Sequence, residues 1–210
     1  MIIAVDGPAA SGKGTIARAL AAHYGLPHLD TGLLYRAVAA TVRDMHLDPA
    51  READAVAACG FDDGLLADPA LRDDETGKLA SVVSAHPLVR AALLQRQKRF
   101  ASQPGGAILD GRDIGTVIAP DADAKLFVKA TPQIRARRRH NELVRNGSTA
   151  TFEQVLADIR ARDARDSGRA TAPLTQAADA AALDTSNLTI DAAVARAIRY
   201  VDAQVASKVR

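Results

Sequence analysis

The chain has 210 residues, of which 48% are hydrophobic and only 3% aromatic, so it can form one domain with an aliphatic core and a small insert. Lys and Arg number 27 against 25 Asp and Glu, and this near-balance argues against a general nucleic-acid binder. Cys59 is the only cysteine, which excludes an intrachain disulfide and a zinc site built from several thiolates. The apolar run at the first residues is too short for a signal peptide and carries no charge. No apolar stretch approaches the length of a membrane span. We therefore expect a cytoplasmic protein without a membrane partner.

The first half of the chain is predicted to begin with a strand, residues 1–6, followed by a glycine-rich segment and a helix to about Tyr24. A second short strand is expected at 27–29, and a helix runs from there to about Arg43. Residues 48–84 hold several glycines and prolines, many aspartates and few long apolar runs. This composition favours a partly irregular insert.

The second half alternates short apolar runs with helical patterns. We expect a helix over 87–100, strands at 107–110, 125–129 and 181–184, and helices that start at Thr131 and Thr151 and that span Val194–Val205. Strands that alternate with helices indicate the α/β class, with a parallel sheet flanked by helices on both faces.

A phosphate-binding loop is the strongest motif in the sequence, and it lies between the first strand and the first helix. Its glycines allow backbone N–H groups to surround a phosphate, to which the next helix adds the positive end of its dipole. Lys13 supplies a mobile charge that can follow a transferred phosphoryl group. The residues expected to bind ATP are Gly7, Pro8, Ala9, Ala10, Ser11, Gly12, Lys13, Gly14 and Thr15.

The loop departs from the usual pattern at one position, because Gly14 rather than Ser or Thr directly follows Lys13. The hydroxyl that usually meets Mg²⁺ is therefore shifted to Thr15, a variant typical of nucleoside monophosphate kinases. We expect Thr15 to be the metal-side residue and Mg²⁺ to keep more of its water ligands.

Phosphate loops occur in switches, motors and kinases, so the acceptor needs separate evidence. The sequence has no Asn-Lys-x-Asp motif, which argues against a guanine-nucleotide switch. Arginines gather at 135–139, at 162–169 and at Arg112, and guanidinium groups bind phosphate oxygens in pairs. These clusters favour a kinase whose acceptor is itself a phosphate. The alternatives are a kinase of another small acceptor and, from a different class, a nucleotide-dependent switch.

Several further motifs give a specific resemblance. The residues that carry it are Gly7–Thr15, Leu29–Gly32 with Tyr35 and Arg36, Asp110–Thr116, Arg162–Arg169, Ala172–Leu174, Asp179–Ala180 and Leu183–Ser186. Together they resemble bacterial cytidylate kinases, in the order of that family and over most of the chain outside the insert. The Gly-Arg-Asp-Ile-Gly-Thr run and the arginine series are more specific than the phosphate loop.

The resemblance implies an enzyme that transfers the γ-phosphoryl of ATP to CMP or dCMP with Mg²⁺, in pyrimidine metabolism. It implies catalytic roles for Lys13, Arg36, Arg112, Arg138 and Arg169. Cytosine contacts are implied for Ser81, Arg90 and Asp113, ribose contacts for Arg162 and Asp166, and acceptor-phosphate contacts for Arg36, Arg112 and Arg169, with Thr31 and Tyr35 beside them.

The implied base contacts agree with the chemistry of cytosine. Its N4 amine can donate to the Asp113 carboxylate, while N3 and O2 can accept from Arg90. Uracil presents O4 and N3–H at these positions, which leaves polar groups unpaired at a cost of about 1–3 kcal/mol each.

The resemblance further implies the three-layer fold of P-loop kinases, with a core of residues 1–47 and 85–210. Residues 48–84 correspond to an acceptor-binding insert, shortened relative to the family, which usually has an antiparallel sheet there, and 131–150 to a short lid over ATP. We expect a monomer that binds small-molecule substrates and no nucleic acid.

Overall fold

The computed structural model describes residues 1–208. The chain forms two compact units, one made of Met1–Leu29 with the residues from Ala101 onward, the other of Asp30–Phe100. The second unit contains the predicted insert 48–84 together with the helices before and after it. The acceptor-binding role of the insert stays a prediction. None of the helices in the described part of the chain has the length and apolarity that crossing a membrane requires.

One five-stranded sheet organises the first unit, and its strand order is β2-β3-β1-β4-β5. The strands are β1 (Ile2–Asp6), β2 (His28–Asp30), β3 (Ala107–Gly111), β4 (Ala124–Lys129) and β5 (Ala181–Asp184). The pairs β1–β3, β1–β4 and β4–β5 are parallel. All five predicted strands are confirmed to within one residue at each end.

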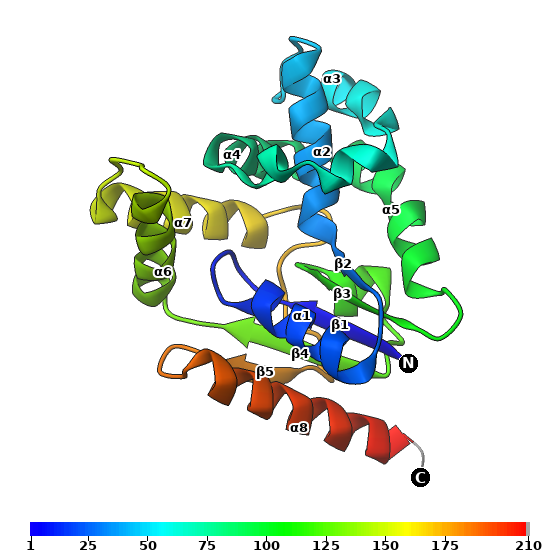
Figure 1. Cartoon of the computed structure of the whole chain (residues 1–210). Helices are drawn as coiled ribbons and strands as arrows, with labels where there is room; N and C mark the ends of the chain where they lie inside the picture. The colour runs from blue at the N-terminus through cyan, green and yellow to red at the C-terminus, as the bar shows by residue number, and fades with distance from the viewer. Residues whose placement is uncertain (209–210) are drawn as a thin grey trace. The chain divides into compact units, whose positions relative to one another are not determined.

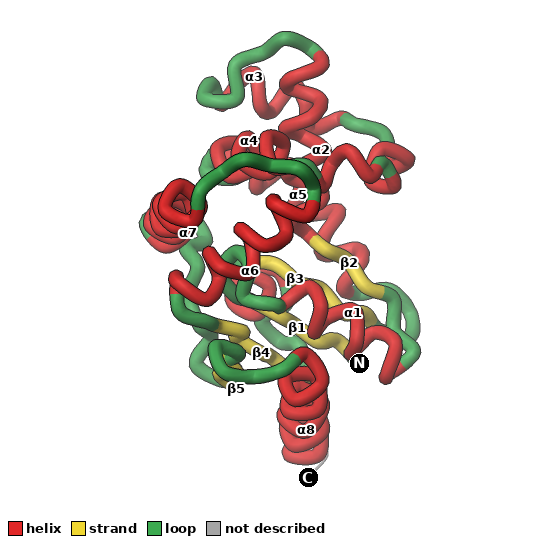
Figure 2. Tube along the Cα trace, turned by 60° about the vertical axis from the view of Figure 1, so that its left-hand side comes forward, coloured by secondary structure: helices red, strands yellow, loops and turns green. Residues whose placement is uncertain are grey.

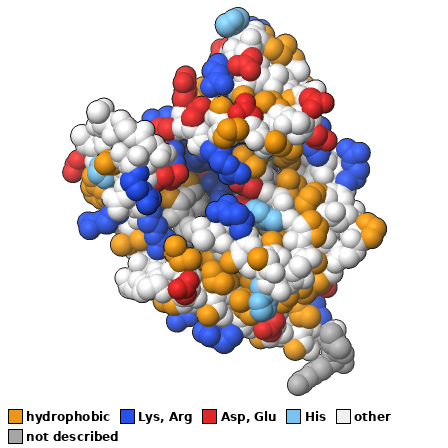
Figure 3. Space-filling model, in the orientation of Figure 1, with side chains coloured by type: hydrophobic (Ala, Val, Ile, Leu, Met, Phe, Trp, Pro, Cys, Tyr) orange, Lys and Arg blue, Asp and Glu red, His pale blue; other side chains and the backbone are white. Residues whose placement is uncertain are grey.

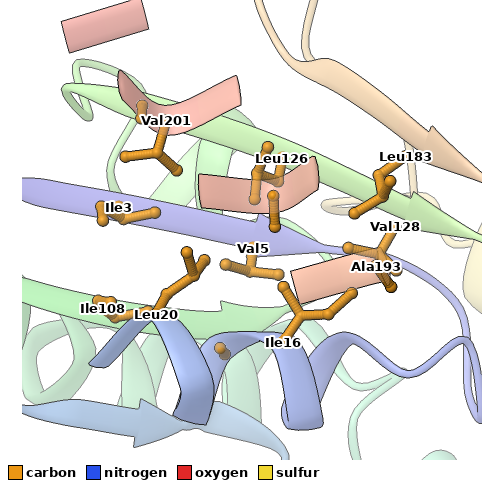
Figure 4. Close-up of a cluster of buried hydrophobic side chains, with 13 residues drawn as sticks. Ile3, Val5, Ile16, Leu20, Ile108, Leu126, Val128, Leu183, Ala193 and Val201 are labelled. Carbon is orange, nitrogen blue, oxygen red and sulfur yellow. The ribbon is translucent and has the colours of Figure 1, made fainter. Parts of the chain in front are cut away.

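The core of this unit lies between the sheet and two helices, α1 (Lys13–Tyr24) and α8 (Ile190–Lys208). Figure 1 shows both helices beside the strands, and both contact β-strands as well as each other. Figure 4 shows the aliphatic side chains that meet there: Ile3, Val5, Ile16, Leu20, Ile108, Leu126, Val128, Leu183, Ala193 and Val201. The core is aliphatic, as the composition predicts.

Parallel pairing determines where the functional loops lie. Asp6, the last residue of β1, is paired with Gly111 of β3 and with Phe127 of β4. The loops that follow β1 and β3 therefore leave the same edge of the sheet, at the carboxyl ends of the strands, where α/β proteins bind ligands.

Two further helices of the first unit, α6 (Pro132–Arg145) and α7 (Phe152–Ser167), pack against each other. The Thr131 side chain accepts a hydrogen bond from the N–H of Ile134, which confirms the predicted start of α6. Thr151 and Gln154 form the predicted capping box of α7.

The second unit is helical. Figure 2 shows helices and loops between β2 and β3, and residues 31–106 contain no strand. Its helices are α2 (Thr31–Asp44), α3 (Glu52–Ala57), α4 (Asp74–Val83) and α5 (Pro87–Ala101), with short 3₁₀ turns at Ala58–Gly60, Asp63–Ala67 and Pro69–Arg72. The composition of residues 48–84 predicts a partly irregular segment and does not indicate α4. Asp73 is the N-cap of this helix, and its side chain accepts a hydrogen bond from the N–H of Thr76 at 2.5 Å. The glycines in this segment argue against a helix and outweigh this capping residue in the prediction.

Candidate active site

The phosphate loop joins β1 to α1, and its backbone takes a conformation that few sequences allow. Ala10 and Gly12 have φ values of 58° and 91°, in the left-handed region. Successive residues of alternating hand turn their N–H groups to one side, where they form an anion-binding concavity. At Gly7 (φ 155°) a Cβ atom would lie 2.1 Å from the backbone oxygen of Val128, so only glycine fits.

Lys13, at the first position of α1, lies beside a buried carboxylate. Its Nζ is 3.6 Å from Oδ1 of Asp110, and Nε2 of His28 is 2.7 Å from Oδ2 of the same residue. Burial by itself raises the pKa of Asp110, but Lys13, the His28 hydrogen bond and Arg112 outweigh it, and the pKa lies below its ordinary value. Asp110 is therefore an anion that holds Lys13 at the loop.

A second buried carboxylate, Asp6, organises the loop after β3. It accepts hydrogen bonds at 2.8 Å from the N–H groups of Ile114 and Gly115, at the start of a π-helical turn, Ile114–Ile118. Burial raises the pKa of Asp6 to about 6, although the two N–H donors lower it. This pair of hydrogen bonds determines how the chain turns directly after Asp113.

Asp166 binds two of the arginines expected at the acceptor phosphate. One of its oxygens accepts from Nε of Arg112 at 2.7 Å, and the other from Nη2 of Arg169 at 2.5 Å. Burial raises the pKa of Asp166, but Arg112, Arg169 and Arg162 together hold it below its ordinary value. The structure thus brings together four of the residues that the sequence analysis assigned to the acceptor. Asp113 lies next to Arg112 in the chain and is itself buried.

Helix α6 presents arginines to the outside of the phosphate loop. Figure 3 shows several Lys and Arg side chains over α6. Arg135 is buried, binds both oxygens of Asp163 and donates to the backbone oxygen of Ala9 at 3.2 Å. Arg138 donates to the backbone oxygen of Ser11 at 3.3 Å and to that of Thr185 at 2.6 Å. The predicted lid arginine therefore contacts the phosphate loop directly.

The second unit holds the remaining predicted acceptor residues. Nη1 of Arg36 donates to the backbone oxygens of Leu71 at 2.7 Å and Asp73 at 2.8 Å. Its guanidinium lies against α4, since a Cβ atom at Gly77 would be 2.6 Å from Nη2 of Arg36.

Arg90 is buried in the same unit. Its guanidinium carbon lies 5.5 Å from the ring centre of Tyr35, and Nη1 donates to the backbone oxygen of Ser84 at 3.3 Å. Ser81 and Thr31 are buried as well. The structure thus brings Tyr35 and Arg90 together, a cation–π arrangement that also holds the guanidinium in place.

Comparison with known proteins identifies the family. The family model described as "Cytidylate kinase" matches residues 3–203. The chain belongs to the cytidylate kinase family. A curated cytidylate kinase of Xanthobacter autotrophicus is 60% identical over 99% of this chain and 100% of its own length. Those of Rhodopseudomonas palustris (strain HaA2) and a Bradyrhizobium species are 56% and 57% identical, over the whole of both chains. The chain is therefore a nucleoside monophosphate kinase.

Solved structures support the fold of this cytidylate kinase family member. An uncharacterised protein of Eubacterium ventriosum matches with a TM-score of 0.56 at 16% identity, over 96% of this chain and 98% of its own. A sugar kinase of Janibacter matches with a TM-score of 0.50 at 15% identity, over 97% and 95%. At these identities the likeness concerns the fold alone, and with the parallel sheet it confirms the predicted α/β class.

The phosphate loop and the end of β3 offer a hydroxyl and a carboxylate, which suit a hydrated Mg²⁺. Thr15 is exposed in the first turn of α1, and a Cβ atom at Gly14 would lie 3.8 Å from Oδ2 of Asp110. Hydroxyl and carboxylate oxygens are the ligands that Mg²⁺ prefers, and it usually keeps several waters. Residues 1–208 contain no cluster of three or more His, Cys, Asp or Glu that could hold a metal alone.

Four residues of this region were not among the predicted site residues. Asp110 and Asp6 had a usable signal, because each ends a buried strand and the two strands are neighbours in a parallel sheet. His28 had none, since a histidine in a short strand is ordinary, and Thr185 had no chemical signal of its own, although it lies in the run Leu183–Ser186 that carries the resemblance. Their roles appear only from contacts with residues far away in the sequence.

Proposed function

We propose that the chain transfers the γ-phosphoryl of ATP to CMP or dCMP, giving ADP and CDP or dCDP. The observation that carries this proposal is the buried Asp166, which binds Arg112 and Arg169 in the same compact unit as the phosphate loop. A carboxylate that orients two guanidinium groups suits a site for a small dianion. Family membership over the full chain supports the nucleotide.

ATP would bind with its phosphates on the N–H groups of Gly7–Thr15. Lys13, which Asp110 holds at 3.6 Å, would neutralise charge on the transferred group, and Arg138 would add to it. Mg²⁺, when bound at Thr15 and the ATP oxygens, would offset charge on the β- and γ-phosphates.

The acceptor phosphate would be bound by Arg36, Arg112 and Arg169, with Thr31 and Tyr35 nearby. Its attacking oxygen needs no general base, because the second pKa of a phosphate monoester is about 6 and it is ionised at neutral pH. The work of the protein is then to align donor and acceptor and to neutralise their charges.

The base and ribose would be read by the remaining residues. We propose that Asp113 accepts from the cytosine N4 amine, while Arg90 and Ser81 pair with its acceptor atoms. Arg162 and Asp166 would contact the ribose. A carboxylate has about four acceptor positions, so Asp166 can accept from a ribose hydroxyl in addition to its two arginines.

The test is ADP formation by the purified protein with ATP and Mg²⁺, in the presence of CMP, dCMP, UMP, AMP or no acceptor. We expect strong stimulation by CMP or dCMP and weak stimulation by UMP. Asp113→Asn, which can offer an amide donor to O4 of uracil, should shift the ratio of kcat/KM values toward UMP. Equal and slow turnover with every acceptor would contradict the proposal and favour a switch or a kinase of another small molecule.

A cytoplasmic location, a monomeric state and the lid role of 131–150 belong to the same proposal. The contact of Arg138 with the phosphate loop supports the lid role. Sedimentation velocity at working concentration tests the monomer.

A further inference from the structure

The outer side of the phosphate loop carries two carbonyl groups that need donors from elsewhere. Ala10 and Gly12 have left-handed φ values, and the residues before them, Ala9 and Ser11, direct their carbonyl oxygens to side-chain donors outside the loop. Both hydrogen bonds are partly buried, and a carbonyl withdrawn from water without a donor is costly, so these bonds stabilise the anion-binding form of the loop.

Helix α6 supplies one donor to each carbonyl. Arg135 and Arg138 are three residues apart, so they lie on one side of the helix, and they bind Ala9 and Ser11 respectively. Ala9 and Ala10 also pack against the small apolar cluster of α6 and α7 around Ala136. The helix thus contacts the loop through both polar and apolar groups.

Thr185 joins this arrangement from the end of β5. Its hydroxyl lies 2.8 Å from the Ser11 oxygen and 3.2 Å from the Lys129 oxygen, and it accepts from Nη1 of Arg138 at 3.0 Å. Its backbone N–H donates to Lys129 at 2.8 Å and its backbone oxygen accepts from Nη2 of Arg138. A hydroxyl has one proton, which the shorter distance assigns to Ser11.

We propose that Thr185 is a positioning residue for ATP, which holds the Ser11 carbonyl and the Arg138 guanidinium in one arrangement. It contacts no nucleotide in this scheme and acts through the phosphate loop and through Arg138. The inference deepens the proposed function and rests on it for the identity of the bound nucleotide.

The expected consequence is specific to one substrate. Without the hydroxyl, the Ser11 carbonyl loses its hydrogen bond at 2.8 Å and keeps the longer one from Arg138 at 3.3 Å, so the loop is less restrained in the form that binds phosphates. ATP affinity should therefore fall, whereas the acceptor residues around Asp166 in the same unit keep their own ion pairs. The Thr185 backbone bond to Lys129 remains in any variant except proline.

The experiment compares Thr185→Val with Thr185→Ser, and measures the equilibrium Kd of ATP without acceptor by calorimetry. Valine keeps the shape and removes the hydroxyl, and we expect the Kd to rise about tenfold, as for one buried hydrogen bond. Serine restores the hydroxyl and should restore the wild-type Kd. In steady state, KM for ATP should rise by a similar factor while KM for the acceptor changes less than about twofold.

Thr189→Val is the matched control. The Thr189 hydroxyl accepts from the N–H of Ala192 at the start of α8, outside the loop, so its loss should lower the melting temperature without changing the ATP Kd. If Thr185→Val does not fold, Thr185→Ala against Thr185→Ser gives the same comparison. The proposal would be overturned if a variant without the hydroxyl bound ATP with the wild-type Kd, or if KM for ATP and KM for the acceptor changed equally. The ATP Kd does not depend on which acceptor is used, so failure of the CMP assignment would be seen separately in the acceptor assay.

Discussion

Asp166 and Arg112, which are 54 residues apart in the chain, form an ion pair with an Oδ2–Nε distance of 2.7 Å, while the other oxygen of Asp166 binds Arg169. The side chains of Asp166, Arg169 and Arg112 are 1%, 5% and 14% exposed, so the carboxylate is buried and both arginines are largely withdrawn from solvent. Removing a charge from such a pair leaves uncompensated buried charge, which makes it a sensitive point for both stability and activity.

We expect Asp166→Asn to lower the free energy of unfolding by about 3 kcal/mol, because a neutral amide cannot satisfy two buried guanidinium groups. Activity should fall about 100-fold as the two arginines lose their orientation. Urea unfolding and steady-state assays measure the two effects. Asp158→Asn, at an exposed position of the same helix, is the control and should change neither. A fully stable and active Asp166→Asn variant would contradict the role of this carboxylate.

Asp6 should give the stability a pH dependence of unusual sign. Its pKa is about 6 in the folded protein against 3.8 for an ordinary aspartate, so the folded state binds the proton more tightly. Its stabilising contribution is full below about pH 4 and is lost as the pH rises through about 6. The wild-type minus Asp6→Asn difference in unfolding free energy should fall by about 2 to 3 kcal/mol across that window.

Carboxylates with a lowered pKa change the stability with pH in the opposite direction, and at lower pH values than Asp6 does. Asp110 and Asp166 contribute stability above the ordinary aspartate pKa, and this is lost as the pH falls through their lower folded pKa values. A flat wild-type minus Asp6→Asn difference between pH 4 and pH 6 would show that the Asp6 pKa is not raised.

Gly7→Ala should abolish tight ATP binding, because the new Cβ atom would lie 2.1 Å from a backbone oxygen and the loop must move. We expect the ATP affinity to fall about 100-fold, as for the loss of about two hydrogen bonds to the phosphates. Gly25→Ala is the matched control at the other end of α1: it has a φ of 65° with nothing within 4 Å, so it should cost only about 1 kcal/mol of stability. Equal ATP affinities for the two variants would contradict this account of the loop.

Gly77→Ala tests the proposed role of Arg36 without altering Arg36 itself. Alanine stabilises an α-helix by up to about 1 kcal/mol over glycine, but its Cβ would lie 2.6 Å from Nη2 of Arg36 and would displace the guanidinium. We expect KM for CMP to rise about tenfold, while stability changes little, because the loss of the Arg36 hydrogen bonds to Leu71 and Asp73 offsets the gain in helix propensity. Lys78→Ala on the same helix should leave KM unchanged, and an unchanged KM in Gly77→Ala would argue against Arg36 as an acceptor residue.

The sheet was predictable because four of its five strands are short, mainly apolar runs, whereas β2, with the sequence His-Leu-Asp, was indicated by Gly25 and Pro27 before it. Helix α4 was not foreseen, because Gly77 and the surrounding aspartates lower helix propensity, and its start depends on a single cap at Asp73. Segments with weak intrinsic preference take their structure from packing, and α4 packs on α2.

The site was predictable where residue type alone suggests chemistry, as at Lys13 or in the arginine series. Contacts such as those of Thr185 with Ser11, 174 residues away, follow from the order β1-β4-β5 in the sheet. No local pattern encodes that order, so the hydrogen bonds that hold the loop and its arginines in place could not be inferred from the sequence.

The most direct test of the central claim is to follow the label of [γ-³²P]ATP with the wild-type protein, Mg²⁺ and CMP. We expect one labelled CDP for each ADP formed, and very little labelled inorganic phosphate when CMP is left out. Release of the label as inorganic phosphate at the same rate with and without CMP would contradict phosphoryl transfer to a nucleotide and would indicate a hydrolytic switch.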